Sequence, residues 1–151
     1  MADLEPIRAG LEQAVPFNQH VGLVVEEVAL GRGVVRLPDT EALRNHTGSQ
    51  HASALFAAGQ AASGAALAAV FVEQLPALDL LPQGAQITYN KISRGDILAT
   101  AILGSDPDTL LEELAREGCV EFSVDVSLTD GAKATVAELS VRWLVRHAQE
   151  E

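Results

Sequence analysis

The chain has 151 residues, enough for one domain with a substantial hydrophobic core and too few to divide comfortably into two. Hydrophobic residues make up 48% and charged residues 21%, which is typical of a globular protein and argues against disorder. The formal net charge of -11 argues against nucleic acid or an anionic membrane surface as a partner, because both require a basic face.

Cysteine usage and the first residues bear on the cellular compartment. The single cysteine, Cys119, excludes a disulfide within the chain and a cysteine-based zinc site. We expect this residue to be partly buried at the start of a strand. Residues 1–14 contain no basic segment followed by an apolar one, as a secretion signal would. We therefore expect a cytoplasmic protein.

The first forty residues predict one helix and two strands. Apolar residues at helical spacing predict an amphipathic helix within residues 1–15, which ends before Pro16. Residues 21–28 and 33–37 are rich in valine and predict two strands, joined by a tight turn at residues 29–32. The apolar positions of the helix are Leu4, Ile7 and Leu11.

Residues 45–72 are the most distinctive stretch of the sequence. A polar lead-in precedes an alanine-rich run in which Gln60 is the one uncharged polar side chain of any size. The run approaches the ~20 residues that span a bilayer, but it is weakly hydrophobic and lacks flanking basic anchors. A helix that is apolar on all sides in a globular protein is a buried central helix. We therefore expect no membrane span.

The second half of the chain predicts four strands and one inserted helix. Two prolines in residues 74–82 indicate a connecting segment. Residues 86–92 and 97–103 are predicted to pair with each other through a turn at residues 94–96. The second of these strands is apolar on both faces and should be central in the sheet. A capping aspartate, an early proline and a final glycine predict a small helix over residues 106–118.

The last two strands are predicted to form an antiparallel hairpin. Residues 121–129 alternate between apolar and polar side chains, and residues 134–146 return after the favoured turn Asp130-Gly131. Short connections predict an antiparallel sheet covered by the long helix, an α+β fold in a single domain spanning residues 1–151. The side chains expected to point inward from the last strand are Leu139, Val141, Trp143 and Val145.

The polar lead-in to the long helix is the predicted functional site. A helix start carries unpaired backbone N–H groups and the positive end of the helix dipole, which stabilise negative charge on a carbonyl oxygen. A purely structural interpretation is also open, with Ser49 as helix cap, Asn45 as a turn residue and the histidines as hydrogen-bonded neighbours. The residues concerned are Asn45, His46, Gly48, Ser49, Gln50 and His51.

The spacing of these residues resembles that of a known superfamily. The pattern N-x-x-G-x-x-H-A over residues 45–52 is similar to the N-x-x-G-x-x-H-G-G of hotdog-fold acyl-CoA thioesterases of the phenylacetyl-CoA thioesterase type. The resemblance continues through residues 16–28, 33–38 and 87–101, and it is nearest to uncharacterised members that carry H-A. It implies a hotdog fold, with an antiparallel sheet wrapped around one long central helix, and hydrolysis of a thioester.

The same resemblance assigns roles to particular residues. It implies that Asn45 orients the thioester or the attacking water and that His51 helps to hold the site. It places the oxyanion-binding backbone at Ala52 and Gly48. The Asp or Glu of active relatives falls on Gln60. Because an amide neither accepts a proton near neutral pH nor matches a carboxylate as a nucleophile, the usual mechanism is impaired, although an amide can position water.

Helix geometry implies that one chain does not hold a complete site. Ala52 and Gln60 are eight residues apart, which is roughly 12 Å along a helix axis. Two antiparallel copies of the helix would bring the start of one to Gln60 of the other. We therefore expect a C2 homodimer with two composite sites, or a homotetramer that contains it.

Other titratable and charged residues are further candidates. His46 or His20 can act as the base that Gln60 cannot be. Glu26 and Glu27 are neighbours in a predicted strand, so one of them should point to each face. The histidines have no carboxylate at metal-ligand spacing, so we expect no metal and no cofactor besides a CoA thioester as substrate or ligand. Candidate partners for CoA phosphates are Lys91, Arg94, Arg142 and Arg146.

Three functions fit these residues. The first is hydrolysis of an acyl-CoA-type thioester, weak or by a variant mechanism because of Gln60. The second is a non-catalytic acyl or acyl-CoA binding protein that kept the pocket and lost the base. The third is hydration or dehydration of an acyl thioester, which needs a histidine paired with an acid, and His51 has no obvious acidic partner.

Overall fold

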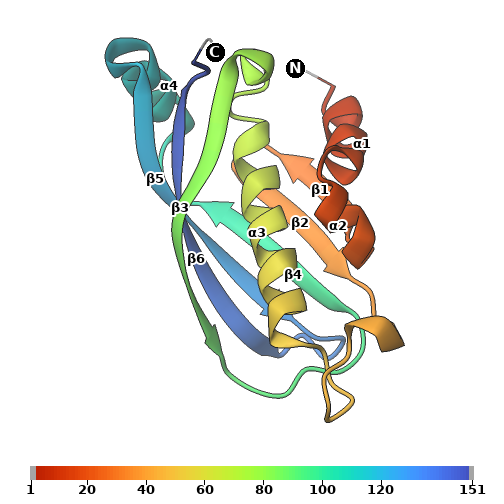
Figure 1. Ribbon diagram of the computed structural model, residues 1–151. Coiled ribbons are helices and arrows are strands. Elements are labelled where there is room, and N and C mark those ends of the chain that lie inside the picture. The colour runs from red at the N-terminus through yellow and green to blue at the C-terminus, as the bar shows by residue number, and fades with distance from the viewer. Residues whose placement is uncertain (1–2, 150–151) are drawn as a thin grey trace.

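The computed structural model describes residues 3–149, and it shows one long helix held in a curved antiparallel sheet (Figure 1). The helices are α1 (Glu5–Ala14), α2 (Pro16–Val21), α3 (Ala52–Ala68) and α4 (Pro107–Glu117), with 3-10 turns at Glu41–Leu43 and Leu75–Ala77. The strands are β1 (Val24–Ala29), β2 (Arg32–Leu37), β3 (Leu78–Tyr89), β4 (Ile97–Leu103), β5 (Cys119–Thr129) and β6 (Thr135–His147).

The sheet has six strands in the order β1-β2-β4-β5-β6-β3, and every neighbouring pair is antiparallel. It curves around α3, while α1 and α2 lie beside that helix on the side of β1 (Figure 1). The predicted α+β arrangement, an antiparallel sheet wrapped around one long helix, is confirmed. None of the helices in residues 3–149 combines the length and the apolar character that crossing a membrane requires.

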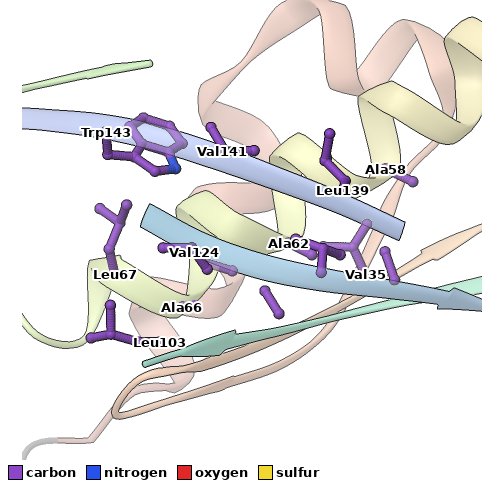
Figure 2. Close-up of a cluster of buried hydrophobic side chains, with 14 of the residues drawn as sticks. Val35, Ala58, Ala62, Ala66, Leu67, Leu103, Val124, Leu139, Val141 and Trp143 are labelled. Atoms are coloured by element: carbon purple, nitrogen blue, oxygen red, sulfur yellow. The ribbon is translucent and has the colours of Figure 1, made fainter. Parts of the chain in front are cut away.

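The core lies between α3 and the concave face of the sheet. Ala58, Ala62 and Ala66 of the helix are fully buried against branched side chains of the strands, such as Val35 and Val141 (Figure 2). Small helix residues let the backbone of the sheet come close: a Cβ at Gly33 of β2 would meet Ala62 O and lie 2.7 Å from Ala65 Cβ. The inward positions predicted for the last strand are all buried, as expected.

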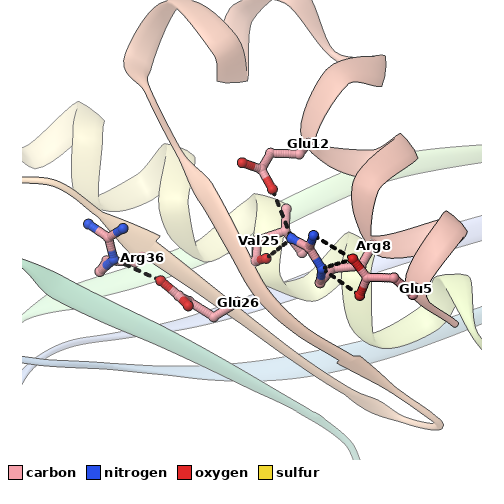
Figure 3. Close-up of polar contacts among 6 residues, drawn as sticks. All are labelled: Glu5, Arg8, Glu12, Val25, Glu26 and Arg36. Atoms are coloured by element: carbon pink, nitrogen blue, oxygen red, sulfur yellow. Dashed lines mark hydrogen bonds and ion pairs between the residues drawn. The ribbon is translucent and has the colours of Figure 1, made fainter.

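Helix α1 is linked to the sheet by an arginine in addition to its apolar contacts. Arg8 donates to Glu5 at 2.7 Å, to Glu12 at 3.0 Å and to the carbonyl of Val25 in β1 at 2.8 Å (Figure 3). The hydrogen bonds between Arg8 and Glu5 raise the pKa of the guanidinium and lower the pKa of the carboxyl. The predicted amphipathic helix is present, and its apolar side chains pack against the core.

The segment after α3 differs from the sequence prediction. Residues 74–82 are not a simple connection, because β3 already begins at Leu78, and β3 pairs with β6 instead of β4. Pro82 is tolerated because β3 is an edge strand whose ladder is interrupted between Pro82 and Gly84. The prediction that β4 is central is confirmed, since it lies between β2 and β5.

Pro16 begins a helix and does not merely end one. It occupies the first turn of α2, where its missing N–H costs nothing, and Gly22 ends this helix with a φ of +83°. As a consequence β1 starts at Val24, three residues later than predicted. Residues 106–118 behave as predicted: Asp106 caps α4 by accepting from Thr109 N–H at 3.1 Å, and Gly118 ends it.

Two further predictions near β5 are confirmed only in part. β5 and β6 form the predicted hairpin around Asp130-Gly131, but Thr129 pairs with Thr135, so the loop is longer than the favoured two-residue turn. The carboxylate of Asp130 organises this loop by accepting from the N–H groups of Ala132 and Ala134, each at 3.0 Å. Cys119 lies at the start of β5 as expected, but it is exposed.

Candidate functional site

The loop before α3 is held together by Asn45. Its carboxamide oxygen accepts from the N–H and hydroxyl of Thr47, at 3.0 and 2.8 Å, and from the N–H and hydroxyl of Ser49, both at 3.1 Å. Gly48 makes the turn possible with a φ of +77°. Asn45 Nδ2 has no hydrogen-bond partner within residues 3–149, so the amide nitrogen is the part of this side chain that can reach a ligand.

Gln50 anchors the same loop to the body of the protein. Its side chain is buried, 3% exposed, and Nε2 donates to Pro38 O at 3.2 Å and to Gly95 O at 3.0 Å. These two carbonyls fix the orientation of the amide, because the oxygen could not face them. Oε1 is buried without a partner among the described residues, which is the environment in which proteins hold an ordered water.

His51, and not Ser49, caps α3. Its Nδ1 accepts from Ser53 N–H at 2.9 Å, while the His51 carbonyl accepts from Ala54 and Leu55. These bonds use three of the first four N–H groups of the helix. Ala52 is an exposed residue, and within residues 3–149 its N–H has no acceptor. The helix therefore offers one free donor at its positive end, at the position that the sequence resemblance assigns to the oxyanion.

Gln60 lies two turns further along α3, on the side that the sheet does not cover. It is partly exposed, and its side chain makes no hydrogen bond within the described residues. With Phe17, Ser53 and Tyr89 it lines a hollow of about 310 Å³. Within one chain, Gln60 and the Ala52 N–H cannot contact the same carbonyl group. They lie eight residues apart on one helix, which is about 12 Å along its axis.

Tyr89 and Phe17 are site residues that the sequence did not reveal. Tyr89, at the end of β3, donates from its hydroxyl to Ala52 O at 3.1 Å, and burial raises the pKa of this phenol. Tyr89 thus positions the first turn of α3. Both lie in stretches that share the family resemblance, residues 16–28 and 87–101, but no motif singles them out, since α2 and β3 reach the start of α3 only through tertiary packing.

The other histidines are solvent-exposed. His46 lies in the loop beside Asn45, and His20 lies in the last turn of α2. Neither lines the hollow that contains Gln60. In residues 3–149, no three His, Cys, Asp or Glu side chains gather in a way that could hold a metal ion.

Glu26 and Glu27 do not point to opposite faces of the sheet. Both are exposed, with Glu26 paired to Arg36 at 2.7 Å (Figure 3) and Glu27 to Arg32 at 3.2 Å. The cause is a bulge in β1, where the register with β2 shifts between Val25 and Glu27. A bulge places two consecutive residues opposite one, so the alternation of faces fails there.

The four candidate phosphate-binding cations do not lie together. Arg94 is the nearest to the helix start, with Nη1 3.4 Å from Gly48 O. Lys91 pairs with Asp130 at 3.3 Å. Arg142 and Arg146 alternate with buried residues of β6 and therefore lie on the convex face of the sheet, away from α3. Only Arg94 thus remains beside the loop that begins the helix.

Several solved structures resemble this chain over nearly its whole length. A protein of unknown function and probable thioesterase from Pseudomonas aeruginosa is 27% identical, with 97% of both chains covered and a TM-score of 0.84. A protein of unknown function from Chlorobaculum tepidum is 14% identical, with 95% of this chain and 94% of that chain covered and a TM-score of 0.84. A thioesterase enzyme from Staphylococcus aureus is 14% identical, covers 87% of this chain and 99% of its own, and has a TM-score of 0.71.

These likenesses define the class of structure: the chain has a hotdog fold of the thioesterase-like kind. The model of the family described as a domain of unknown function, DUF4442, matches residues 5–145, and the chain belongs to this family. A comparison with curated proteins found no match.

Proposed function

We propose that this protein hydrolyses an acyl-CoA-type thioester, as a variant member of the phenylacetyl-CoA thioesterase-like branch of the hotdog superfamily. One observation carries the proposal: the N–H of Ala52, an exposed residue, has no acceptor among the described residues. It lies at the positive end of α3, where the motif Asn45 to Ala52 puts the thioester oxygen in similar proteins. The likeness to a probable thioesterase at 27% identity over 97% of the chain supports it.

The reaction needs little from the side chains beyond orientation. Water adds to the thioester carbon, and the carbonyl oxygen becomes negative against Ala52 N–H. The carbon–sulfur bond then breaks, and the leaving sulfur takes the proton that the attacking water gives up, which yields an acid and a thiol. One oxyanion donor of this kind is worth about a hundredfold to a thousandfold in turnover. Gln60 and Asn45 Nδ2 orient the water and the thioester. Because neither is a base, the reaction lacks the contribution of roughly 10² to 10⁴ that a positioned base supplies.

A homodimer completes the site in this proposal. The edge strand β3 is twelve residues long, and such an edge readily pairs with a second copy. Phe56 of α3 and Ile87 of β3 are only partly covered in one chain, on the side where Gln60 lies. Antiparallel pairing around a twofold axis would place the Ala52 N–H of one copy near Gln60 of the other.

Thiol release from short, long and aromatic acyl-CoAs tests this function. We expect Asn45→Ala and Gln60→Ala to lower kcat/KM by about tenfold or more, and Gln60→Glu to raise it by about a hundredfold, since a carboxylate restores a base. Gln13→Glu places the same charge on an exposed helix position away from the site and serves as the matched control. A native enzyme whose turnover ignores all three substitutions at Asn45 and Gln60 would refute the proposed site.

The second candidate function is binding of an acyl thioester without catalysis, and the amide of Gln60 is the observation that favours it. In that case the native protein binds acyl-CoA but releases no thiol, and Gln60→Glu switches hydrolysis on. Isothermal titration with a non-hydrolysable thioether, beside the thiol assay, separates the two functions.

A further inference from the structure

An apolar cavity borders the uncovered side of α3. It has a volume of about 500 Å³ and lies between α1, α2, α3 and the first half of β3. Apart from Asn18, Gln60 and the indole of Trp143, its walls are apolar, and none of the lining residues in the described part of the chain is charged. A buried carboxylate or ammonium would find no partner there, so the cavity suits an uncharged apolar group.

Small residues of α3 form the floor of this cavity. Ala57, Ala61, Gly64, Ala65 and Ala68 line it one helical turn after another, so the helix leaves a trough. The trough starts at Gln60, whose side chain also lines the hollow beside the start of α3, and passes the ring of Trp143. The cavity therefore adjoins the proposed thioester site at Gln60.

The helix also sets the length of the group that fits. From Gln60 to Ala68 the axis rises about 12 Å. An extended polypeptide advances about 3.6 Å over the three backbone bonds of each residue, or about 1.2 Å per bond. At the same advance per bond, an acyl chain of about ten bonds fills the trough. Leu67, Ala68 and Leu75 line the cavity beyond Gly64.

Phe17 of α2 lies where this cavity meets the rest of the site. It lines the cavity, the hollow around Gln60 and a third hollow of about 190 Å³ that contains His51. It is 62% exposed in spite of its apolar ring. Its ring therefore lies at the mouth of the trough, where the cavity adjoins the hollow around Gln60.

We infer that the substrate is an uncharged, aliphatic, medium-chain acyl thioester, whose chain of about eight to ten carbons lies in the trough with Phe17 over its first methylenes. This inference rests on the proposed function for the CoA thioester end of the substrate. The acyl chain is recognised by the cavity. The motif places this protein in the phenylacetyl-CoA thioesterase-like branch. The phenylacetyl group itself, however, is too short to fill this trough.

Trp143 reports on the cavity directly, since it is the one tryptophan of the chain. The probes are butyl-, octyl- and hexadecyl-CoA thioethers, which cannot be hydrolysed, and a carboxybutyl-CoA thioether, with Trp143 emission as the readout. We expect octyl to bind about 250-fold more tightly than butyl, because it buries four further methylenes and each strengthens binding about fourfold. We expect hexadecyl to gain nothing over octyl, and carboxybutyl to bind more weakly than butyl.

Substitutions on the trough floor sharpen the test. Ala61→Leu should weaken octyl and butyl binding alike, by about tenfold or more, because Ala61 follows Gln60 directly and its larger side chain would fill the start of the trough. Gly64→Ala places a methyl 3.8 Å from the Trp143 ring, an ordinary contact, and should weaken octyl binding a few-fold. Gly10→Ala in α1 is the matched control, because its new Cβ meets nothing within 4 Å.

The role of Phe17 has its own comparison. Phe17→Ala should weaken every apolar thioether about equally, because the ring contacts the first methylenes. Leu30→Ala, at an equally exposed position in the β1–β2 turn, should change nothing. Thermal melting establishes that each variant is folded.

Three results would overturn the inference: no saturable change in Trp143 emission with any thioether, hexadecyl binding far tighter than octyl, or unchanged octyl binding in folded Ala61→Leu. The first result, no saturable change in Trp143 emission, is expected if a second protein molecule fills the cavity in the dimer. If the thioethers bind as expected but no acyl-CoA is cleaved, the cavity is assigned correctly and the proposed hydrolysis fails by itself.

Discussion

Asn45 shows how the two interpretations of one residue can both hold. The sequence offers it either as a turn residue or as a group that orients the thioester. In the structure its oxygen takes four donors from Thr47 and Ser49, which makes it the organiser of the loop. Its nitrogen stays available for a ligand. Residue identity and spacing predict the turn, but which atom is left over depends on how the loop folds back on the side chain.

Asp130 organises the β5–β6 loop in the same manner, and its charge makes the effect depend on pH. The N–H of Ala134, followed by Lys91 and the N–H of Ala132, lowers the pKa of Asp130 below its ordinary value of 3.8. A lowered pKa means that the ionised carboxylate stabilises the fold above that value, and that this contribution is lost as the pH falls through the folded-state pKa.

We therefore expect Asp130→Asn to lower the melting temperature at pH 7, and the difference from the native protein to shrink once the pH falls below 3.8. Melting curves of both proteins across this range provide the measurement. Because Asn keeps an acceptor oxygen, the comparison with Asp130→Ala separates the charge from the hydrogen bonds. A difference that stays constant down to the acid end would contradict the assignment.

At the scale of elements, local signals located most helices and strands but not their partners. The caps Asp106 and Gly118 and the alternation of β5 act within a few residues, so the sequence predicts these elements well. β3 starts earlier than predicted because Pro76 and Pro82 suggest a loop, and only the edge position in the sheet makes Pro82 acceptable within the strand. The bulge at Glu26 likewise has no signal in the local sequence.

The packing of α3 on β2 depends on Gly33. A methyl group there would meet Ala62 O and come within 2.7 Å of Ala66 N, and neither backbone can move easily in the core. We expect Gly33→Ala to lower the free energy of unfolding by about 3 kcal/mol, the upper part of the usual range for overpacking. Urea titrations measure this change. Gly104→Ala, where a Cβ meets nothing within 4 Å, is the control, and equal stability of the two variants would show that the close approach is unimportant.

At the scale of the whole molecule, one chain leaves the site incomplete. The helix start with its free N–H and the side chain of Gln60 lie along one straight helix, and the edge of β3 and the apolar side of α3 are open on the same side of the molecule. A twofold axis beside β3 would cover these surfaces together. The sequence already pointed to this arrangement through helix geometry, and the uncovered edge adds a surface for it.

Light scattering should therefore give a mass of at least twice the 15.9 kDa of one chain. Phe56→Glu puts a charge on the uncovered side of α3 and should yield folded monomers with no thioesterase activity. Ile102→Glu, on the convex face of the sheet where Ile102 is 47% exposed, should leave the dimer intact. If the native protein is a tetramer and Ile102→Glu converts it to a dimer, the interface between dimers lies on the convex face. A native protein that is monomeric would refute the composite site.

The sequence alone determined the α+β class, the long apolar helix and the motif from Asn45 to Ala52, because periodicity, capping and spacing are properties of neighbouring residues. Only the tertiary structure decided that β3 pairs with β6, that Tyr89 meets Ala52, and that Phe17 joins three hollows along α3. These contacts join residues far apart in the chain. Their formation depends on how the sheet closes around the helix, which local patterns do not encode.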